Sequence, residues 1–377
     1  MDKKFRVGIL GLGRAGRFMH GPELALFPGF FEIAAACDHA ADRRENLPEV
    51  FANAKIYSSL AEMLKDDSLD IITIATRNGD HVPHAMQVLE AGKMAVIDKP
   101  FAVNMEQVSQ LLEADKKYPG KIFLRCNRRF EPAFVQIREV IDSGILGEIA
   151  MVKIYRHPGF VRRCDWQTLA ECHGGLFNNW GPHFVDQALQ LLNSPVKDIW
   201  CSLQHHIGGG DAEDQVKLIL TGENNRIIDL EISTISTIPG HFYEIWGKRG
   251  SLVIDNTGKE MKLRYLKPEV KFTRLDGVKE NFPLVYGNPN ENLQFIEETR
   301  PIVQTRGHVL QRGKKLDQVE GDWSKGYTYP DTMWYYLYQA LTGQGEYPVT
   351  LADGVAIVET MAKAKKVAGF TPSVLEF

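Results

Sequence analysis

A short run of glycines, Gly11, Gly13 and Gly16, is the first place where residue types and spacing could do chemistry. It follows directly on the apolar stretch Val7–Leu10. Gly11 permits a tight turn out of a strand, Gly13 lets a pyrophosphate approach the backbone, and Gly16 lets the next helix pack closely. The N-terminus of that helix offers free N–H groups and a partial positive charge. The run therefore predicts a phosphate-binding turn between a strand and a helix.

An acidic residue stands where a dinucleotide site needs one. The apolar stretch Phe31–Cys37 predicts a second strand, and Asp38 follows it at once. Dinucleotide sites place an acid about 20 residues past the glycines, where it holds the ribose 2′-hydroxyl. A carboxylate favours NAD over NADP, because a 2′-phosphate would meet like charge. Arg43 and Arg44 lie close enough to leave NADP open.

A lysine ends another predicted strand. Asp98-Lys99-Pro100 closes the apolar stretch Lys93–Asp98, and ligands bind at the carboxyl ends of strands in parallel sheets. Lys99 should therefore point toward the place where a nicotinamide would lie, and could help move the proton of a substrate hydroxyl. Its ordinary pKa of about 10.4 is too high for an efficient base, but burial and a neighbouring positive charge would lower it. The alternative is a solvated lysine.

The third chemical signal is a histidine in the segment Gly174–Asp186. A helix predicted to begin near Gly181 or Pro182 places His183 in its first turn. An imidazole titrates at a pKa of about 6.5, which suits proton exchange with an alcohol. Asn179 precedes His183 by four residues, on the same face if the helix begins that early. The alternative is a histidine satisfied by the backbone of the helix start.

The bulk composition excludes several classes of function. The chain has 377 residues, 44% of them hydrophobic and 24% charged, with a formal net charge of −4. There is no basic footprint for nucleic acid, no apolar run that could span a membrane and no secretory segment before the first strand. Five scattered cysteines without a C-x-x-C pair predict free thiols in a reducing cytoplasm and no metal site. They are Cys37, Cys126, Cys164, Cys172 and Cys201.

Strands and helices alternate through the first third of the chain. The predicted strands cover 7–10, 31–37, 70–75, 93–98 and 121–126, with helices at about 84–91 and 104–118. Repeated strand–helix units predict a doubly wound parallel sheet. We therefore expect a nucleotide-binding domain over residues 1–125.

Residues 126–377 change rhythm and predict a second α/β domain. A helix at Pro132–Ser143 precedes strands that follow one another through short turns, which predicts a large, mainly antiparallel open sheet. These strands are expected at about 149–157, 198–206, 214–221, 226–234, 241–247 and 251–255. Residues 256–330 are expected to be long loops. Helices at Asp331–Leu341 and Leu351–Ala368 close the chain, and the last is a candidate to pack back toward the first domain. A sheet face without a partner favours a homo-oligomer.

The order of these motifs resembles the glucose–fructose oxidoreductase / inositol dehydrogenase (Gfo/Idh/MocA) family. The pattern includes T-x-N-x-x-H at Thr76, Asn78 and His81, and the resemblance runs through the nucleotide domain and on to about residue 255. It implies an N-terminal Rossmann domain that holds NAD or NADP and an α/β domain whose open sheet packs into dimers or tetramers. It also implies substrates such as sugars and polyols. The family lysine falls on Lys99 and the catalytic histidine on His183.

Two positions depart from the family pattern. Asp98 replaces the glutamate that precedes the family lysine, which is a mild change. Asn179 replaces the aspartate four residues before the catalytic histidine. An amide keeps hydrogen-bonding capacity but loses the charge. It can orient a substrate hydroxyl, but it cannot stabilise a protonated His183 or act as a base.

Further residues are expected to line the pocket. Arg128 lies in a segment that looks like the family's domain junction, and Tyr155, Arg156, His157 and Trp166 lie at or after a strand that faces the cleft in relatives. An aromatic plate with hydrogen-bonding neighbours suits a sugar. Ordinary packing and surface charge are the alternative for each of them.

These observations predict an NAD(P)-dependent dehydrogenase or reductase of carbohydrate metabolism that transfers a hydride between nicotinamide and a sugar, polyol or glycoside. Two alternatives remain open, an NAD-retaining enzyme that cleaves glycosides through transient oxidation and a non-catalytic NAD-binding sensor. The expected cofactor-binding residues are Gly11, Gly13, Arg14, Ala15, Gly16, Asp38, Thr76, Asn78, His81, Asp98 and Lys99. The expected substrate-binding residues are Lys99, Arg128, Tyr155, Trp166, Asn179 and His183, with Lys99 and His183 also catalytic.

Overall fold

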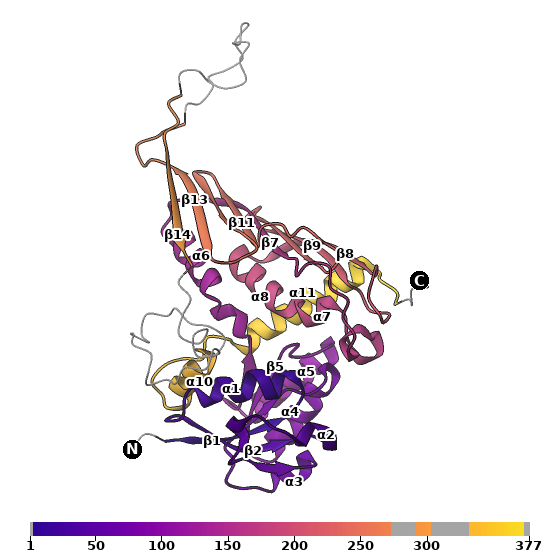
Figure 1. Cartoon of the computed structure of the whole chain (residues 1–377). Helices are drawn as coiled ribbons and strands as arrows, with labels where there is room; N and C mark the ends of the chain where they lie inside the picture. The colour runs from indigo at the N-terminus through magenta and orange to yellow at the C-terminus, as the bar shows by residue number, and fades with distance from the viewer. Residues whose placement is uncertain (1–2, 273–290, 303–331, 373–377) are drawn as a thin grey trace.

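Two sheets organise the chain (Figure 1). The computed structural model describes residues 3–272, 291–302 and 332–372. Strands between residues 5 and 125 form a six-stranded sheet, and strands between residues 149 and 301 form an eight-stranded sheet. The α/β fold class expected from the sequence is confirmed.

The first sheet is parallel throughout, in the order β3-β2-β1-β4-β5-β6. Its strands are β1 (Phe5–Leu10), β2 (Phe31–Cys37), β3 (Lys55–Tyr57), β4 (Ile71–Ile74), β5 (Met94–Asp98) and β6 (Ile122–Arg125). All four residues of β4 are buried, as expected of a strand with both faces covered. The strand order reverses between β1 and β4. This switch point is where such sheets bind ligands, beyond the carboxyl ends of the strands.

Short and long helices cover this sheet. They are a π-helix at Gly16–His20 that leads into α1 (Gly21–Ala25), then α2 (Ala41–Arg44), α3 (Leu60–Leu64), α4 (His81–Glu90) and α5 (Met105–Lys117). Asn104 begins α5 as predicted, because its side chain accepts a hydrogen bond from the backbone N–H of Gln107 at 2.9 Å. The helix predicted from His84 starts three residues earlier, at His81.

The second sheet has the order β14-β13-β12-β11-β7-β10-β9-β8. Only β7 and β10 run parallel among its paired strands, so the sheet is mainly antiparallel as predicted. Its strands are β7 (Ile149–Arg156), β8 (Val196–Gln204), β9 (Gln215–Gly222), β10 (Ile227–Ser233), β11 (Tyr243–Gly247), β12 (Gly250–Ile254), β13 (Glu260–Leu266) and β14 (Phe295–Pro301). The other α-helices of the described residues are α6 (Pro132–Asp142), α7 (Leu176–Asn179), α8 (Gly181–Leu192), α10 (Thr332–Leu341) and α11 (Leu351–Ala368).

The expectation of loops over 256–330 is wrong where the structure describes that range. β13 and β14 extend the sheet by two strands, paired from Glu260↔Pro301 to Leu266↔Phe295. In β13 the buried Met261 and Leu263 alternate with the exposed and charged Glu260, Lys262 and Arg264, so only every second residue of this stretch is hydrophobic. The expectation for 273–290 and 303–330 lies outside the described residues.

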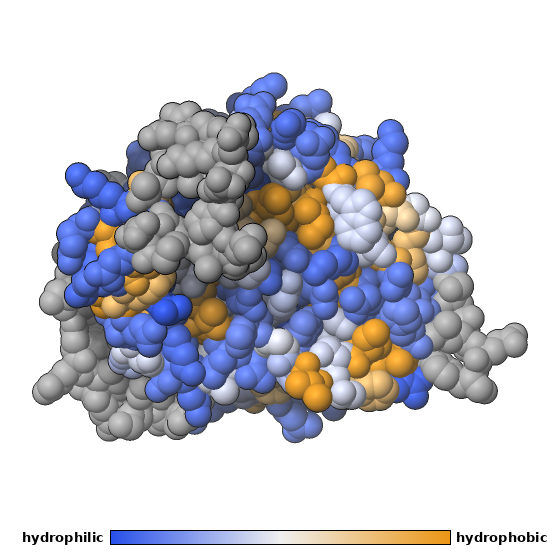
Figure 2. All heavy atoms as spheres, turned by 90° about the horizontal axis from the view of Figure 1, so that it is seen from above, coloured by the Kyte–Doolittle hydropathy of each residue, from blue (hydrophilic) through white to orange (hydrophobic). Residues whose placement is uncertain are grey.

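The outer face of the second sheet carries no helix in Figure 1, where α7, α8 and α11 lie beneath it. Trp200 and Trp246 on this face are 53% and 43% exposed. Between them Lys153 pairs with Glu244 at 3.1 Å, and other charged side chains also pair along the strands. Figure 2 shows hydrophobic patches among hydrophilic residues on this side of the molecule. The predicted homo-oligomer would use this face.

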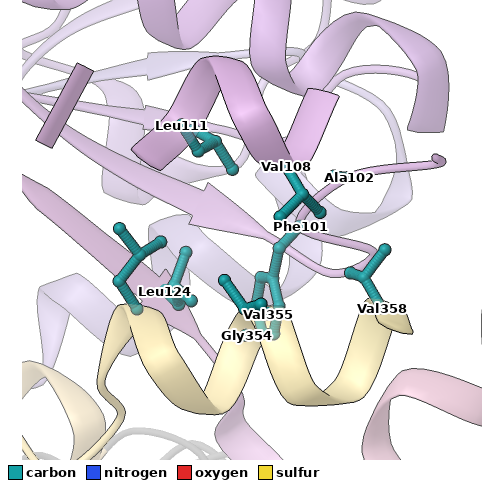
Figure 3. A pocket seen from close by; sticks show the side chains of 9 residues that line it. Phe101, Ala102, Val108, Leu111, Leu124, Gly354, Val355 and Val358 are labelled. Carbon is teal, nitrogen blue, oxygen red and sulfur yellow. The ribbon is translucent and has the colours of Figure 1, made fainter. Parts of the chain in front are cut away.

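The last helix lies between the two sheets (Figure 1). α11 contacts α5 and β6 of the first domain, and also α8 and β8 of the second. Figure 3 shows Val355 and Val358 of α11 facing Phe101 and Val108 across an apolar pocket. A side chain at Gly354 would overlap the Cδ1 atom of Leu124 in β6. Close contact between α11 and the first domain therefore depends on a glycine. None of the described helices is long and apolar enough to cross a membrane.

We expect Gly354→Leu to lower the free energy of unfolding by about 1–3 kcal/mol, because a buried side chain must be forced against Leu124. Chemical and thermal denaturation measure the effect. The exposed Gly345, where an added Cβ would meet only an ordinary contact at 3.6 Å, provides the matched control Gly345→Leu. Equal stability of the two variants would contradict the packing of α11.

Candidate active site

The glycine run forms the turn that its sequence predicts. Gly11 has φ +93°, and a Cβ atom there would lie 2.5 Å from the carbonyl oxygen of Ala75. A Cβ atom at Gly16 would overlap the carbonyl oxygen of Gly11. At Gly13, by contrast, an added Cβ atom would meet nothing within 4 Å. Gly11 and Gly16 are thus required for the backbone packing of the turn itself. Gly13, in contrast, borders open space that a phosphate group could occupy.

Asp38 lies beside this turn. Its Oδ2 accepts a hydrogen bond from the backbone N–H of Leu12 at 2.8 Å, and its Oδ1 accepts one from Ala40 at 3.0 Å. Arg44 donates to the carbonyl oxygens of Asp38 and His39 at 2.8 and 2.9 Å. A carboxylate therefore flanks the open space at Gly13, while the Arg44 guanidinium is held by backbone oxygens. This arrangement fits a dinucleotide with a free ribose hydroxyl.

The T-x-N-x-x-H residues, Thr76, Asn78 and His81, hold the backbone in place where β4 and β5 end. Both ring nitrogens of His81 lie at hydrogen-bond distance from carbonyl oxygens, 2.8 Å from Pro100 and 3.2 Å from Thr76. Desolvation lowers the pKa of this buried imidazole. The amide of Asn78 donates to the carbonyl oxygen of His173 at 2.7 Å, which joins the two domains. The side chains of His81 and Asn78 therefore make hydrogen bonds within the protein. Their expected contribution to cofactor binding would come from the backbone segments that these hydrogen bonds hold in place.

Lys99 reaches from the end of β5 into the second domain. Its Nζ donates hydrogen bonds to Asn179, at 2.8 Å to the carbonyl oxygen and 3.0 Å to Oδ1. In the described part of the chain, no carboxylate lies within ion-pair distance of this ammonium. Desolvation, together with the nearby cations of Arg125 and Arg128, lowers the pKa of the half-buried Lys99 to about 8, against the opposing effect of Asp98.

His183 lies in the first turn of α8, as predicted. The side chain is buried, and its Nδ1 has no hydrogen-bond partner among the residues that the structure describes. Desolvation lowers its pKa well below the usual value, and the positive charges of Lys99 and Arg128 act in the same direction. The imidazole is therefore neutral at pH 7. A buried polar atom without a partner is uncommon in proteins and is typical of a position that a ligand completes.

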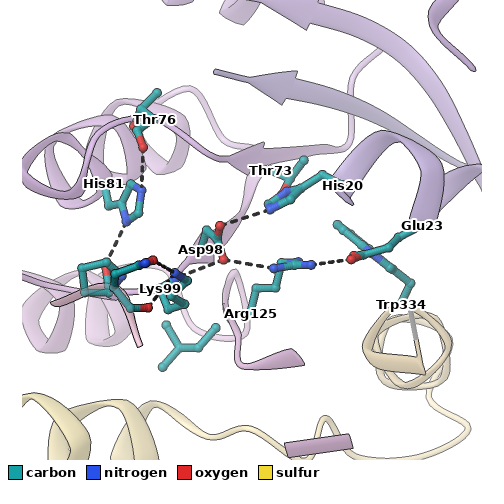
Figure 4. Close-up of polar contacts among 12 residues, drawn as sticks. His20, Glu23, Thr73, Thr76, His81, Asp98, Lys99, Arg125 and Trp334 are labelled. Atoms are coloured by element: carbon teal, nitrogen blue, oxygen red, sulfur yellow. Dashed lines mark hydrogen bonds and ion pairs between the residues drawn. The ribbon is translucent and has the colours of Figure 1, made fainter. Parts of the chain in front are cut away.

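A buried ion network supports the strand end that carries Lys99 (Figure 4). Asp98 accepts a hydrogen bond from Arg125 Nη1 at 3.1 Å, and Arg125 Nη2 lies 2.5 Å from Glu23 Oε1. The indole N–H of Trp334 donates to the other oxygen of Glu23 at 3.0 Å. The Arg125 cation holds the pKa of Asp98 well below its ordinary value, against the effect of burial. His20 also lies near Asp98, at 3.4 Å.

Sequence reasoning missed Glu23, Arg125 and Trp334. One signal was available, because Arg125 ends a predicted strand that neighbours the strand ending in Asp98. The two residues are cross-strand partners in the parallel register. A lone charged residue at the carboxyl end of a buried strand would have pointed to an ion pair. Glu23 and Trp334 left no such local signal.

Two arginines converge on an aromatic ring next to His183. The guanidinium carbons of Arg128 and Arg156 lie 4.7 and 4.8 Å from the centre of the Trp180 indole. The Trp180 and His183 rings meet edge to face at 6.4 Å. Arg128 also pairs with Glu131. The expected pocket residue Arg128 is thus joined to the site through Trp180, which the sequence had not singled out.

Tyr155 does not join this group, and its expected place in the pocket is corrected. Its hydroxyl donates to Asp229 Oδ2 at 2.9 Å, and Lys217 lies over its ring at 4.9 Å, both on neighbouring strands. Tyr155 and Lys153 alternate along β7 with the buried Val152 and Ile154, so they lie on the outer face of the sheet. The next residue, Arg156, therefore faces the site.

Trp166 lies against the first domain. The guanidinium of Arg77, which follows β4, lies 6.0 Å from the centre of the Trp166 ring. The same connecting segment brings His173 to Asn78, and Arg163 is among the cations that lower the pKa of Lys99. The segment between β7 and α7 therefore borders the site from the second domain. No cluster of three or more His, Cys, Asp or Glu side chains among the described residues could hold a metal ion.

Comparisons with known proteins place the two halves of the chain in one family. Residues 5–125 match the family model described as oxidoreductase family, NAD-binding Rossmann fold, and residues 134–253 match the GFO/IDH/MocA C-terminal domain. The chain is 29% identical over 258 residues to the uncharacterized oxidoreductase YdgJ of Escherichia coli, covering 67% of this chain and 72% of that protein.

A second relative has a named activity. The scyllo-inositol 2-dehydrogenase (NADP(+)) IolW of Bacillus subtilis is 28% identical over 316 residues, which cover 82% of this chain and 85% of IolW. Among solved structures, an NAD-binding protein from Listeria innocua superposes with a TM-score of 0.76 at 22% identity, covering 97% of this chain and 95% of that one. This last likeness shows the fold.

The two glycines of the turn should respond differently to alanine. We expect Gly13→Ala to keep the melting temperature of the protein but to weaken NADH binding by at least about tenfold, because its methyl group fills the open space beside the turn. Gly11→Ala should lower the melting temperature, since it combines a positive φ with a backbone clash. Fluorescence titration with NADH and thermal unfolding measure both effects.

Gly29→Ala, at a glycine that also has nothing within 4 Å, is the control for the loss of a glycine in itself. The assignment of Gly13 to the cofactor would be wrong if Gly13→Ala bound NADH as tightly as Gly29→Ala.

Proposed function

This chain belongs to the Gfo/Idh/MocA oxidoreductase family, with an NAD-binding Rossmann domain, and on that premise we propose that it is a dehydrogenase or reductase that interconverts a hydroxyl and a carbonyl group on a sugar or polyol. One observation supports this reaction above the others. An ammonium group with a pKa of about 8 lies at the carboxyl end of β5, held by a neutral residue of the second domain and beside a neutral imidazole. Such a centre suits proton exchange with an oxygen atom at neutral pH.

The geometry of Lys99 suggests how the proton moves. An ammonium has three N–H donors, and two of those of Lys99 are used by Asn179. The proton of the third N–H can be transferred to a carbonyl oxygen of the substrate, or taken back from the substrate hydroxyl. The other two N–H groups stay hydrogen-bonded to Asn179. Nicotinamide, when bound, supplies the hydride acceptor or donor. The proton and the hydride together account for both atoms that distinguish an alcohol from a carbonyl compound.

His183 has a different role in this proposal. Its pKa lies well below the usual value, so it holds a proton poorly at pH 7 and serves better as a hydrogen-bond partner of the substrate oxygen. The sequence suggested that His183 takes or gives the proton, with Lys99 polarising the substrate oxygen or sharing the proton. The pKa shifts instead favour Lys99 for the transfer of the proton and His183 for polarisation, because a group with a pKa near the working pH is the more efficient acid–base catalyst.

The substrate class rests on similarity. IolW, which covers most of the chain, is named for the oxidation of an inositol, and the sequence motifs resemble a family of sugar and polyol enzymes. Oxidation or reduction at a CH–OH carbon of such a compound is the corresponding proposal. A homodimer or homotetramer in the cytoplasm remains a prediction.

We expect Lys99→Ala and His183→Ala each to lower kcat by at least about 100-fold, because each removes a polar group that acts on the substrate oxygen. NADH absorbance with a panel of polyols, sugars and their keto forms measures the rate, and NADH titration checks that the cofactor still binds. Lys121→Ala, at the exposed start of β6, is the control. Wild-type rates in both variants would contradict the proposal, and glycoside cleavage without NADH accumulation would favour the NAD-retaining alternative.

The pH dependence should follow Lys99. A pKa of about 8 means that the amine is protonated below pH 8, so the rate of carbonyl reduction should fall as pH rises through 8 and the rate of oxidation should rise. Asn179→Asp places a carboxylate at the ammonium, which favours the charged form and should move this midpoint to higher pH by at least about one unit. Rates measured from pH 6 to about 10 test the shift.

The control for this variant is Asn53→Asp, which makes the same change at an exposed residue before β3, a strand separated from β5 by three others in the sheet. A midpoint that stayed in place in Asn179→Asp, or moved to lower pH, would contradict the assignment of the titration to Lys99.

A further inference from the structure

A single helical turn carries the residue that holds Lys99. This turn is α7, and two hydrogen bonds of the Lys99 ammonium go to its last residue, Asn179, at the carbonyl oxygen and at Oδ1. A helix of four residues is not stable through its own backbone hydrogen bonds. Other parts of the second domain must therefore hold α7 where Lys99 can reach it.

A buried carboxylate holds the start of this turn. Glu213, which lies two residues before β9, is 8% exposed, and its Oε1 accepts a hydrogen bond from the backbone N–H of Phe177 at 2.9 Å. The carbonyl oxygen of Glu213 accepts a second one from Leu176 at 3.0 Å. A Cβ atom at Gly175 would overlap the carboxylate, so this close approach depends on a glycine. Glu213 thus binds the first two N–H groups of α7.

The segment that carries Glu213 is itself held in place. The next residue, Asp214, accepts hydrogen bonds from the backbone N–H groups of His206, Ile207 and Gly208 at 2.9, 2.7 and 2.7 Å. These bonds fix the connection between β8 and β9. The Glu213 side chain can therefore anchor α7 instead of following its movements.

A lysine of α11 holds the other side of the turn. Lys365 Nζ donates a hydrogen bond to Oδ1 of Asn178 at 2.6 Å. The amide of Asn178 in turn donates to the carbonyl oxygens of His173 and Gly174, both at 3.0 Å. Because Asn178 directly precedes Asn179, these bonds fix the rotation of α7 about its axis.

Burying these two charged groups costs free energy. Desolvation raises the pKa of the Glu213 carboxyl and lowers the pKa of the Lys365 ammonium, and their mutual attraction offsets only part of this effect. Uncharged side chains of similar size would fill the same space at lower cost. In some proteins, buried charges select one conformation among several. Here the element that both groups contact is α7.

We propose that Glu213 and Lys365 are positioning residues, which hold α7 so that the carbonyl oxygen and Oδ1 of Asn179 stay aligned with the Lys99 ammonium. The use of Lys99 in proton transfer rests on the proposed function. The alignment of Asn179 with Lys99 does not, and it can be measured without a substrate.

The first test separates the hydrogen bond of Glu213 from its charge. Glu213→Ala removes both, whereas the amide oxygen of Glu213→Gln can still accept from Phe177. With lysines labelled with ¹³C at Cε, we expect the Lys99 midpoint to fall by about one pH unit in Glu213→Ala, because the ammonium loses acceptors that favour its charged form. Glu213→Gln should keep most of the wild-type midpoint. Glu223→Ala, at an exposed residue just after β9, is the control.

The second test removes the contact from α11. Lys365→Met keeps an unbranched side chain but loses the donor to Asn178. Loss of a cation alone would raise the Lys99 midpoint, whereas displacement of Asn179 should lower it, so the direction separates the two effects. The adjacent and exposed Lys366 provides the matched control Lys366→Met.

Turnover provides an independent measurement. We expect Glu213→Ala to lower kcat by about 10–100-fold, as for a misplaced catalytic group, while NADH affinity changes by less than about twofold. Glu213→Gln should recover most of the rate. Thermal unfolding shows which variants are folded, and Lys365→Met still decides the question if Glu213→Ala does not fold.

The outcomes distinguish this inference from the proposed function. A Lys99 midpoint that stays in place or rises in folded Glu213→Ala or Lys365→Met would overturn the inference, and so would an equal fall in Glu213→Gln. Turnover of a sugar or polyol with no such change in the midpoint would leave the oxidoreductase proposal intact. The expected midpoints in a protein that turns over no sugar or polyol would support the inference and count against the proposed reaction.

Discussion

The site depends on one constraint, the placement of a lysine ammonium between two domains with no carboxylate partner in the described part of the chain. Lys99 leaves β5 at the switch point of the first sheet, and Asn179 of the second domain accepts two of its hydrogen bonds. Since Asn179 is neutral, desolvation and neighbouring arginines lower the pKa of Lys99 to about 8. Desolvation, together with the positive charges of Lys99 and Arg128, lowers the pKa of His183 and keeps its imidazole neutral at pH 7. The protonation of both residues therefore follows from how the domains meet.

The elements that close the chain hold this arrangement in place. Trp334 of α10 donates to Glu23, which pairs with Arg125, and Arg125 holds Asp98 next to Lys99. α11 lies between the sheets and also supports the second domain, where Lys365 donates to Asn178, the neighbour of Asn179. A buried ion pair that loses one partner costs about 3–5 kcal/mol. Loss of the Trp334 indole would leave a buried oxygen of Glu23 without its donor, so a change in α10 would reach Asp98 through Glu23 and Arg125.

The sequence predicted those parts of the site that depend on residues close to one another in the chain. The glycine turn, Asp38, the strand end at Lys99 and the helix start at His183 each depend on neighbouring residues in sequence, and each was found. Tyr155 was misplaced because a shift of one residue along a strand reverses the face. The network from Glu23 to Arg125 spans 102 positions and has no local period, so only the fold reveals it. β13 was not predicted because the charged residues on its exposed face obscured the alternation of apolar and polar positions in the sequence.

The titration of Lys99 itself is the most direct test. Labelling lysine side chains with ¹³C at Cε allows the charge of each ammonium to be followed by NMR as pH is changed, and Lys99→Arg identifies the signal by its absence. The account predicts one lysine with a midpoint near pH 8, as the pKa of about 8 requires, and a higher midpoint in Asn179→Asp. A Lys99 signal that titrates at the ordinary value of about 10.4 would contradict it.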